Sequence, residues 1–534
     1  MKEGLKTYNS CRLFAVLVAS MAISVCAHAD TPRLFLNIVI EGLDYDRLQQ
    51  LMPHLGKNGF RRLVNTGVTV VSADYGTPLD NTAAIAMLMT GAAPSANGVG
   101  AEKVFDPVTG RCNSVFSDDK AMGTYTSETL SGKNLLVSTL ADEVRIAGDG
   151  ITYVYTVAPD AAGAIAISGH AVNSALWIDS YSGNWASSTY YKDVPTAIGA
   201  RNKLSPLTSR LDTISWTPSL KNTRYEGIPE VLTHYPFRYT FPRTVTDRIE
   251  NFKRSAMVNR EVTDVAAELI ELMHLGTHEG VDMVNVIYRL DGFRGGKQAD
   301  MRYEMADSYI KVDAWLGSLI TAAERKAPGA VAVMVAGIPS QSGMRRDDER
   351  WQIPSGEFST RRALSLLNVY LMAKFGTGEW MKAYNNGWFY INNDLLSQSS
   401  VNPVQLRTMA AEFLSRMEGV KAVYTLDDVI AGRAGDNPQA LRRNTVVSQS
   451  GDLLIEILPG WEINDDAAIL PQTAAEQHVA HRDVPTVAPV FIMAPGLSAA
   501  KIDTPVDVRV ITPTVSRILR IRSPNGASLP PLSL

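Results

Sequence analysis

Runs of apolar residues separated by helix-like stretches are the feature that most limits how this chain can fold. Runs that are apolar without alternation are typical of parallel strands buried on both faces, and they cover residues 33–43, 281–290, 330–337 and 488–496. Stretches expected to be helical lie between and after them, at residues 44–67, 136–148, 298–326 and 512–519. This alternation predicts a three-layer α/β/α sandwich with a mainly parallel central sheet.

Two stretches interrupt the alternation. Residues 170–260 are aromatic and rich in Ser and Asn, which is typical of a cap or accessory insertion, and residues 340–480 mix helices with short strand-like pieces. Without a repeat or a long linker, the sequence predicts one domain over residues 30–534 with insertions. In such sheets the site lies at the carboxyl ends of the strands, a rule that selects Glu41, Asn81, Asp160, Asp291, Gly337 and Ile338.

The N-terminus has the pattern of a secretory signal peptide. A basic start precedes a short apolar core at residues 13–25 and an Ala-His-Ala site at 27–29. We therefore expect residues 1–29 to be cleaved and the mature chain to be periplasmic or secreted. No other segment of this kind occurs, so no transmembrane segment is expected in the mature chain.

Charge and cysteine content exclude further classes. The net charge of −4, with 20% charged residues, has no basic excess for binding nucleic acid. Of the three cysteines, only Cys112 lies beyond the expected signal peptide. The mature chain therefore has no intramolecular disulfide, and its core must supply the stability.

A loop that enters a helix, residues 76–100, is the first candidate site. Helix N-termini favour anions and activated nucleophiles. The position expected to carry the attacking group holds Asn81, whose amide is not a hydrolytic nucleophile, and Thr82 follows it.

Several motifs resemble the alkaline phosphatase superfamily, and within it the exported, phosphate-irrepressible branch related to type I phosphodiesterases and nucleotide pyrophosphatases. The resemblance covers nearly the whole mature chain, and it is carried by LFLNIVIEGLDYDRL, GFRRLVNTGV, MLMTGAAPSANGVG, ISGHAVNSALWIDSYSGNWASSTYY and APGLSAAKIDTPVDVRVITPTVSRIL. It implies an alkaline phosphatase-like fold and a site with two zinc ions and a threonine nucleophile.

The metal ligands that the resemblance implies are largely absent. The aspartate of the first strand is Glu41, Asp291 is retained, and the threonine position is Asn81. The remaining positions carry no ligand side chain: they are Gly295, Gly337, Ile338 and Val487. Every histidine ligand is lost, so we predict no zinc cofactor.

The positions that contact phosphate in the resemblance are also changed. The asparagine falls at Glu102, and a Lys-x-Arg clamp falls at Asp160 and Ala162. Exchanging a cation for a carboxylate at ~4 Å turns an attraction of roughly 4 kcal/mol into a repulsion, at an effective dielectric near 20. His170 is expected to be structural. His478, His481 and Arg482 are candidates for a small polar site, but two histidines with no third ligand are weak evidence for a metal.

Two functions remain open on these residues. The first is a pseudo-phosphatase that binds or scaffolds an unknown periplasmic protein or small ligand. The second is an active phosphomonoesterase or phosphodiesterase with a rebuilt site, using Thr82 or a water activated by a cation. Glu41 and Asp291, with Asp80, Asn81, Glu102 and Asp160, offer oxygen atoms for such a calcium or magnesium ion.

Overall fold

The computed structural model describes residues 31–192, 194–221, 237–290, 302–340, 354, 356–458, 460–465 and 485–534. The expected signal peptide, residues 1–29, lies outside the described residues, as do Asp291, Gly295, His478, His481 and Arg482. Among the described helices, none combines the length and apolarity that crossing a bilayer requires.

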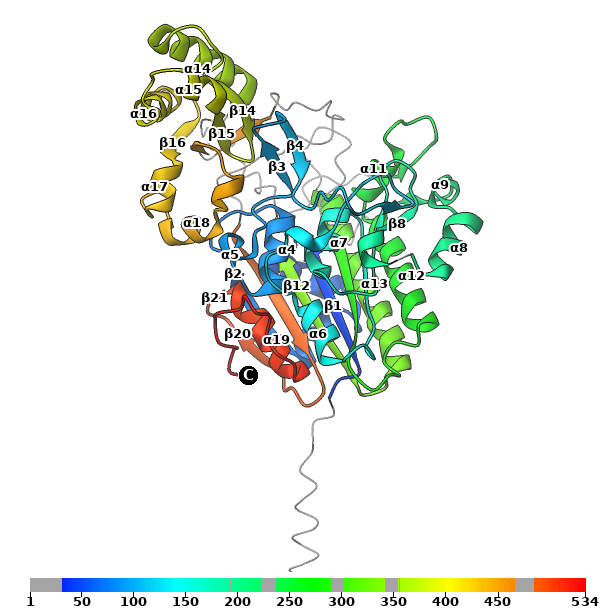
Figure 1. Ribbon diagram of the computed structural model, residues 1–534. Coiled ribbons are helices and arrows are strands. Elements are labelled where there is room, and N and C mark those ends of the chain that lie inside the picture. The colour runs from blue at the N-terminus through cyan, green and yellow to red at the C-terminus, as the bar shows by residue number, and fades with distance from the viewer. Residues whose placement is uncertain are drawn as a thin grey trace, which may run out of the picture.

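An 11-stranded sheet forms the centre of the molecule (Figure 1). Its strands follow the order β20 (Ala500–Ile502), β2 (Val68–Asp74), β19 (Val487–Met493), β12 (Val331–Ile338), β1 (Leu34–Glu41), β11 (Asp282–Arg289), β6 (Val154–Ala158), β7 (Ser174–Ile178), β8 (Trp185–Ser188) and β5 (Gly123–Thr124), with β21 (Val506–Asp507) also beside β2.

Most of these pairs are parallel, as expected. Strand β1 pairs in parallel with β11 and β12 along its whole length, so that Glu41 lies between Arg289 and Ile338. Strand β19 runs antiparallel to both β12 and β2. Because its direction is reversed, its first residue, Val487, lies at the same edge as the last residues of β1, β11 and β12.

Helices cover both faces of the sheet and complete the predicted α/β/α sandwich. One face carries α2 (Tyr45–Leu51), the short helix η1 (Met52–His54), α3 (Phe60–Thr66), α12 (Met257–Leu272) and α13 (Arg302–Lys326). The other carries α4 (Asn81–Thr90), α6 (Leu140–Ala147), α7 (Ala161–Ser168) and α19 (Ile511–Leu519). The short helix α5 (Pro94–Asn97) contacts α4.

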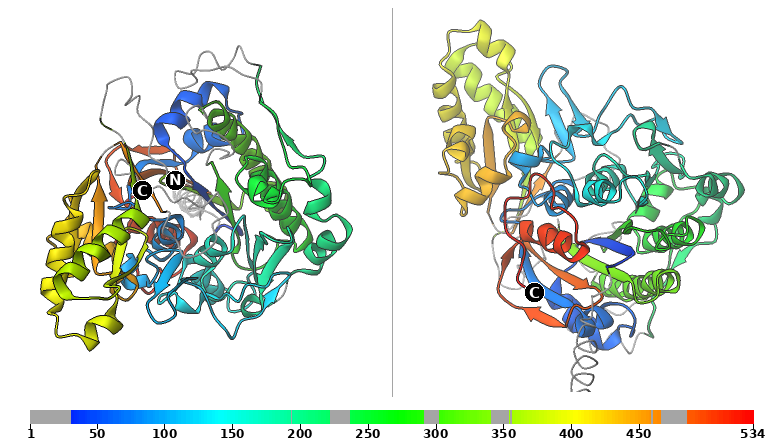
Figure 2. Two further views of the ribbon diagram at one scale, coloured as in Figure 1. Left: turned by 90° about the horizontal axis from the view of Figure 1, so that it is seen from above. Right: turned by 60° about the horizontal axis from the view of Figure 1, so that its bottom comes forward.

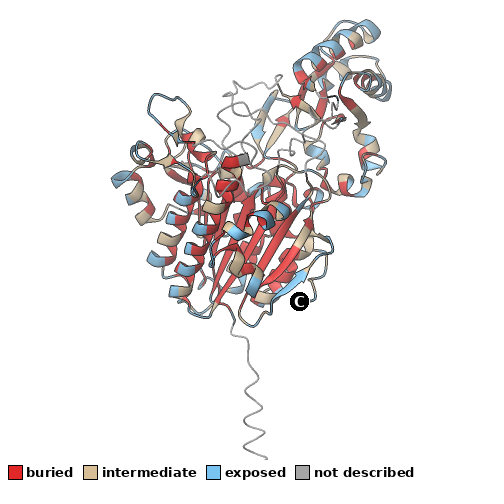
Figure 3. Cartoon of the chain, turned by 180° about the vertical axis from the view of Figure 1, so that it is seen from behind, coloured by how far each residue is buried: buried red, intermediate tan, exposed pale blue. Residues whose placement is uncertain are grey.

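Alternation along the strands divides the apolar core between these two faces. In β1, Leu34, Leu36, Ile38 and Ile40 pack under α12 and α13, whereas Phe35 and Val39 pack under α4 and α7. Successive strand side chains point to opposite faces, so a strand covered on both sides needs apolar residues at every position. Figure 3 shows the resulting band of buried strands.

Accessory elements stand at the carboxyl edge of the sheet. Within residues 170–260, β7 and β8 extend the main sheet, and the accessory elements that follow are α8 (Thr196–Leu204), α9 (Leu207–Arg210), β9 (Ser215–Trp216), β10 (Tyr239–Thr240) and α11 (Arg248–Lys253). The hairpin of β3 (Lys103–Asp106) and β4 (Arg111–Ser114) lies at the same end (Figure 1).

A second insertion, residues 356–465, stands beside the sheet rather than on it (Figure 2). It has a core of its own around a four-stranded sheet in the order β14-β15-β17-β16. Its elements are β13 (Gly356–Ser359), α14 (Thr360–Phe375), β14 (Met381–Asn385), β15 (Trp388–Ile391), α15 (Asn393–Gln398), α16 (Pro403–Leu414), β16 (Val420–Thr425), α17 (Leu426–Ile430), α18 (Pro438–Asn444), η5 (Val447–Gln449), β17 (Leu453–Ile457) and β18 (Trp461–Asn464).

A buried carboxylate anchors the first accessory region to α12. Glu261 accepts hydrogen bonds from Trp185 Nε1 at 3.0 Å, from both terminal nitrogens of Arg210 at 2.5 and 2.6 Å, and from Arg201 at 3.1–3.3 Å. Burial alone would raise the pKa of Glu261, but the two arginines lower this pKa to about 2.

Replacing Glu261 with glutamine is expected to lower the free energy of unfolding near neutral pH by about 3 kcal/mol, the linkage equivalent of that pKa shift. Because the pKa is depressed in the folded state, this contribution is present above about pH 4.5 and disappears as the pH falls toward 2. Urea unfolding across this range should show the wild-type and Glu261→Gln curves converging. The partly exposed Glu268, which contacts Arg201 at 3.2 Å, serves as a control whose removal costs less.

Candidate active site

The loop-to-helix motif folds as the sequence predicts. Helix α4 begins at Asn81 because the Asp80 carboxylate caps it, accepting the Ala83 N–H at 2.8 Å. It ends at Gly91, whose φ of 63° is the left-handed conformation that glycine adopts without strain. The helix is apolar and buried around nearly its whole circumference, so its N-terminus is held rigidly at the carboxyl edge of the sheet.

The side chains at this N-terminus are an amide and a buried threonine. Asn81 occupies the first helical position, and its Oδ1 is buried without a hydrogen-bond partner among the described residues. Thr82 is buried in the next position. The Glu102 N–H donates to the second oxygen of Asp80 at 2.5 Å, and the burial of that carboxyl raises its pKa. Both oxygens of the Asp80 carboxylate therefore accept hydrogen bonds from backbone N–H groups.

A chain of ion pairs crosses the edge of the sheet where the metals of a phosphatase would be expected. The Arg289 guanidinium donates from Nε to the Glu41 carboxylate at 2.7 Å and from a terminal nitrogen to Asp160. Lys253 pairs with the other oxygen of Asp160 and donates to Ser180 Oγ at 2.6 Å. Strand ends supply Glu41 and Arg289, Asp160 precedes α7, and Lys253 ends α11.

The surroundings of Asp160 and Lys253 favour the charged form of both side chains. The side chains of Lys253 and Glu41 are only 3% and 5% exposed, whereas Asp160 is 36% exposed. Burial alone would raise the pKa of Asp160, but Lys253 and Arg289 hold this pKa far below its ordinary value. Burial alone would lower the pKa of Lys253, but Asp160 and Glu250 raise it. Asp160 makes no capping bond to α7, because its carboxylate binds these two cations.

The sequence analysis offers Glu41 and Asp160 as oxygen ligands for a calcium or magnesium ion, and the structure places a protein cation beside each of them. Arg289 and Lys253 already supply the positive charge. Sequence reasoning missed both residues, because Lys253 belongs to an accessory helix and Arg289 is simply the polar end of an apolar run. The sequence signal that could have revealed the ion pair is Arg289 at the end of one predicted strand and Glu41 at the end of another.

Of the other ligand positions that the structure describes, Gly337 and Ile338 lie in packed surroundings, whereas Val487 does not. Ile338 is fully buried in the core under α4. A Cβ atom on Gly337 would lie 2.9 Å from Ala488 Cβ and 3.2 Å from Leu43 Cβ, so even a small side chain has no room there. Val487 is 39% exposed at the start of β19, and Ala162 is buried in α7.

The described residues do not fit the pair of zinc ions that the resemblance implies. Among them, no group of three or more His, Cys, Asp or Glu side chains is placed to hold a metal. His170, predicted to be structural, has Nδ1 2.8 Å from Asp142 and Nε2 2.9 Å from the Leu135 carbonyl. The hydrogen bond to Asp142 raises the pKa of His170. Both ring nitrogens are therefore engaged away from any metal.

The chain is similar to known proteins over most of its length. The family model described as "Type I phosphodiesterase / nucleotide pyrophosphatase" matches residues 35–481. A protein named calcium-transporting ATPase from Myroides odoratus is 24% identical over 532 residues, covering 95% of each chain. Alkaline phosphatase PhoV of Synechococcus elongatus is 24% identical over 525 residues, covering 93% of this chain and 91% of PhoV.

Solved structures agree with the predicted fold. A crystal structure of wild-type alkaline phosphatase PafA superposes with a TM-score of 0.80 at 21% identity, covering 94% of this chain and 98% of that one. PafA of Elizabethkingia meningoseptica is 22% identical in sequence over 530 residues. The alkaline phosphatase-like fold and the resemblance drawn from the motifs are thus confirmed.

Proposed function

We propose that this chain, which belongs to the type I phosphodiesterase / nucleotide pyrophosphatase family, is a pseudo-phosphatase with a binding or scaffolding role. The observation that carries the proposal is the ion-pair chain from Glu41 through Arg289 and Asp160 to Lys253. Where a phosphatase needs open metal ligands, these carboxylates already bind cations of the protein itself.

Electrostatics support the same function. A phosphate monoester carries close to two negative charges near neutral pH. Arg289 and Lys253 are the cations of the cluster, but each contacts carboxylates, and Lys253 also lies 3.4 Å from Glu250. An anion entering the cluster would therefore meet Glu41, Asp160 and Glu250 as well, and it would have to break existing ion pairs before it could bind.

Nucleophile chemistry supports it further. Attack on phosphorus needs a hydroxyl activated by a base or a metal, and the first residue of α4 is Asn81. Thr82, the alternative nucleophile, is buried. We also propose export through cleavage of residues 1–29, no resident zinc, calcium or magnesium, and an unknown periplasmic protein or small ligand as partner.

The test is turnover of nitrophenyl phosphate and bis-nitrophenyl phosphate by the wild-type chain and three variants. Asn81→Thr is expected to restore nothing, because a hydroxyl without metals is not activated. Asn81→Ala and Thr82→Val should match the wild type at the background rate. Turnover by the wild type that is lost in Thr82→Val or Asn81→Ala would instead establish a hydrolase with a rebuilt site.

A further inference from the structure

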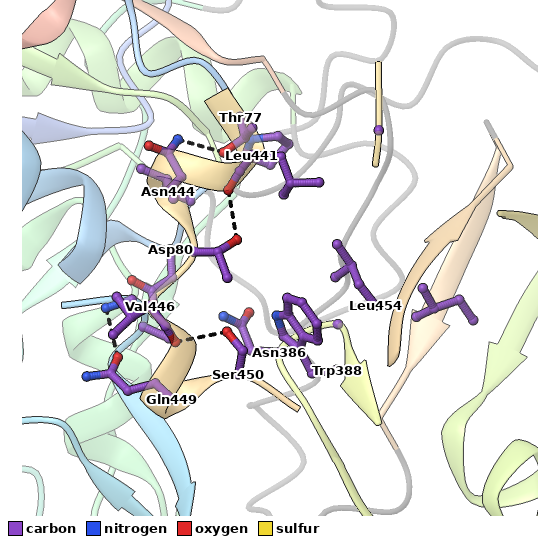
Figure 4. A pocket seen from close by; sticks show the side chains of 18 of the residues that line it. Thr77, Asp80, Asn386, Trp388, Leu441, Asn444, Val446, Gln449, Ser450 and Leu454 are labelled. Atoms are coloured by element: carbon purple, nitrogen blue, oxygen red, sulfur yellow. Dashed lines mark hydrogen bonds between the residues drawn. The ribbon is translucent and has the colours of Figure 1, made fainter. Parts of the chain in front are cut away.

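A cavity of about 440 Å³ lies between the loop before α4 and the second insertion. The sheet domain contributes residues 76–80 and 100–104, and the insertion contributes β15, β17 and the segment from α18 through η5. The volume lies within the range of small-molecule sites. Figure 4 shows Leu441, Asn444 and Val446 on one side and Trp388 and Leu454 on the other.

The two sides are held in place by hydrogen bonds between the insertion and the sheet domain. Gln449 uses both ends of its amide, donating to the Gly98 carbonyl at 2.7 Å and accepting the Gly100 N–H at 3.0 Å. Asn444 donates to the Tyr75 carbonyl at 2.9 Å and to Thr77 Oγ1 at 2.7 Å. The cavity is therefore preformed, and a ligand would not have to order it first.

Apolar and aromatic side chains form much of the cavity wall. Trp388, Tyr390, Leu441, Val446, Leu454 and Ile463 line it. Several polar residues of the wall already make hydrogen bonds within the protein, as Gln449 does. Ser450 Oγ donates to the Val446 carbonyl at 3.0 Å, and Thr445 Oγ1 donates to the Leu441 carbonyl at 2.7 Å. Aromatic and aliphatic walls of this kind bind by contact area.

The charges around the cavity select against anions. Asp80, Asp436 and Glu456 line it together with Lys103. Asp436 and Glu456 both pair with Lys421, at 3.0 and 3.1 Å, so they are also poor partners for an incoming cation. We propose that this cavity binds a neutral, largely apolar small molecule containing an aromatic ring, and not a phosphate ester. None of the ion-pair residues lines it, so this inference stands apart from the proposed function.

The test uses N-phenyl-1-naphthylamine, a neutral aromatic dye whose fluorescence rises in apolar sites. The folded full-length protein should bind it saturably with a stoichiometry of one. Leu441→Trp and Leu454→Trp fill the cavity from opposite sides, and each should weaken binding at least tenfold. Leu366→Trp makes the same exchange on α14, where Leu366 is 42% exposed and outside the cavity, and it should leave binding unchanged.

Three results would overturn the assignment: no saturable binding to the wild type, equal binding by both filled variants, or displacement of the dye by inorganic phosphate. Circular dichroism and thermal unfolding establish that each variant folds. If neither filled variant folds, a crystal of the wild type soaked with the dye decides the matter. Density between Trp388 and Leu441 supports the site, and density only elsewhere contradicts it.

Discussion

Replacing Arg289 with methionine is expected to lower the free energy of unfolding by about 3–5 kcal/mol, the usual cost of removing one partner from a buried ion pair. The substitution keeps most of the side-chain volume but deprives Glu41, which is 5% exposed, of the guanidinium 2.7 Å away. It also removes one of the two cations beside Asp160. Because Asp160 reaches solvent, most of the loss should come from Glu41. Chemical denaturation at neutral pH measures the difference.

A second substitution separates this electrostatic loss from a packing defect. In the double variant Arg289→Met with Glu41→Gln, the buried charge is gone, so part of the stability should return. Arg243→Met removes an exposed arginine that contacts Asp212 at 2.6 Å, and it should have a much smaller effect. An Arg289→Met protein as stable as the wild type would mean that the ion-pair chain does not hold this edge together.

Restoring the acidic ligand at the end of β12 is expected to damage the protein. Gly337→Asp should cost at least about 4 kcal/mol, from overpacking and from burying a carboxylate without a countercharge. The new Cβ would lie 2.9 Å from Ala488 Cβ and 3.2 Å from both Leu43 Cβ and Pro489 Cδ. Denaturant unfolding measures the loss, and titration with zinc should give no recovery.

Gly337→Ala is the matched control, because it introduces the steric conflict without the charge. Its cost should be about 1–3 kcal/mol, clearly smaller than that of the aspartate. If Gly337→Asp unfolds at the same denaturant concentration as the wild type, or if zinc stabilises it, this strand edge can accept an acidic ligand, and the claim that packing excludes one is contradicted.

Much of the fold was predictable from residue pattern. The apolar run around β1 has buried residues at every position, since helices cover both of its faces. Asp80 and Gly91 mark the ends of α4 by local hydrogen bonding and backbone conformation, which depend only on neighbouring residues. Long parallel strands also place Glu41 and Gly337 at one edge, and the structure confirms this.

The contents of the site were less predictable, because ion pairs depend on contacts between distant segments. Arg289 and Glu41 are 248 residues apart in sequence, and no period or spacing links them. Lys253 belongs to an accessory helix, and the sequence does not indicate where this helix packs against the sheet. Asp160 stands at the N-cap position of α7, yet its carboxylate binds cations instead of capping the helix. The cavity beside Trp388 was likewise unforeseen, since it forms between the sheet domain and an insertion that has a core of its own.

Zinc content is the most direct measure of whether Arg289 and Lys253 take the place of the two zinc ions that the resemblance implies. The wild-type chain, equilibrated with excess zinc and then dialysed against buffer, is expected to retain less than one zinc ion per molecule by elemental analysis. Retention of two zinc ions, with Arg289 displaced from Glu41 in the loaded protein, would contradict the account.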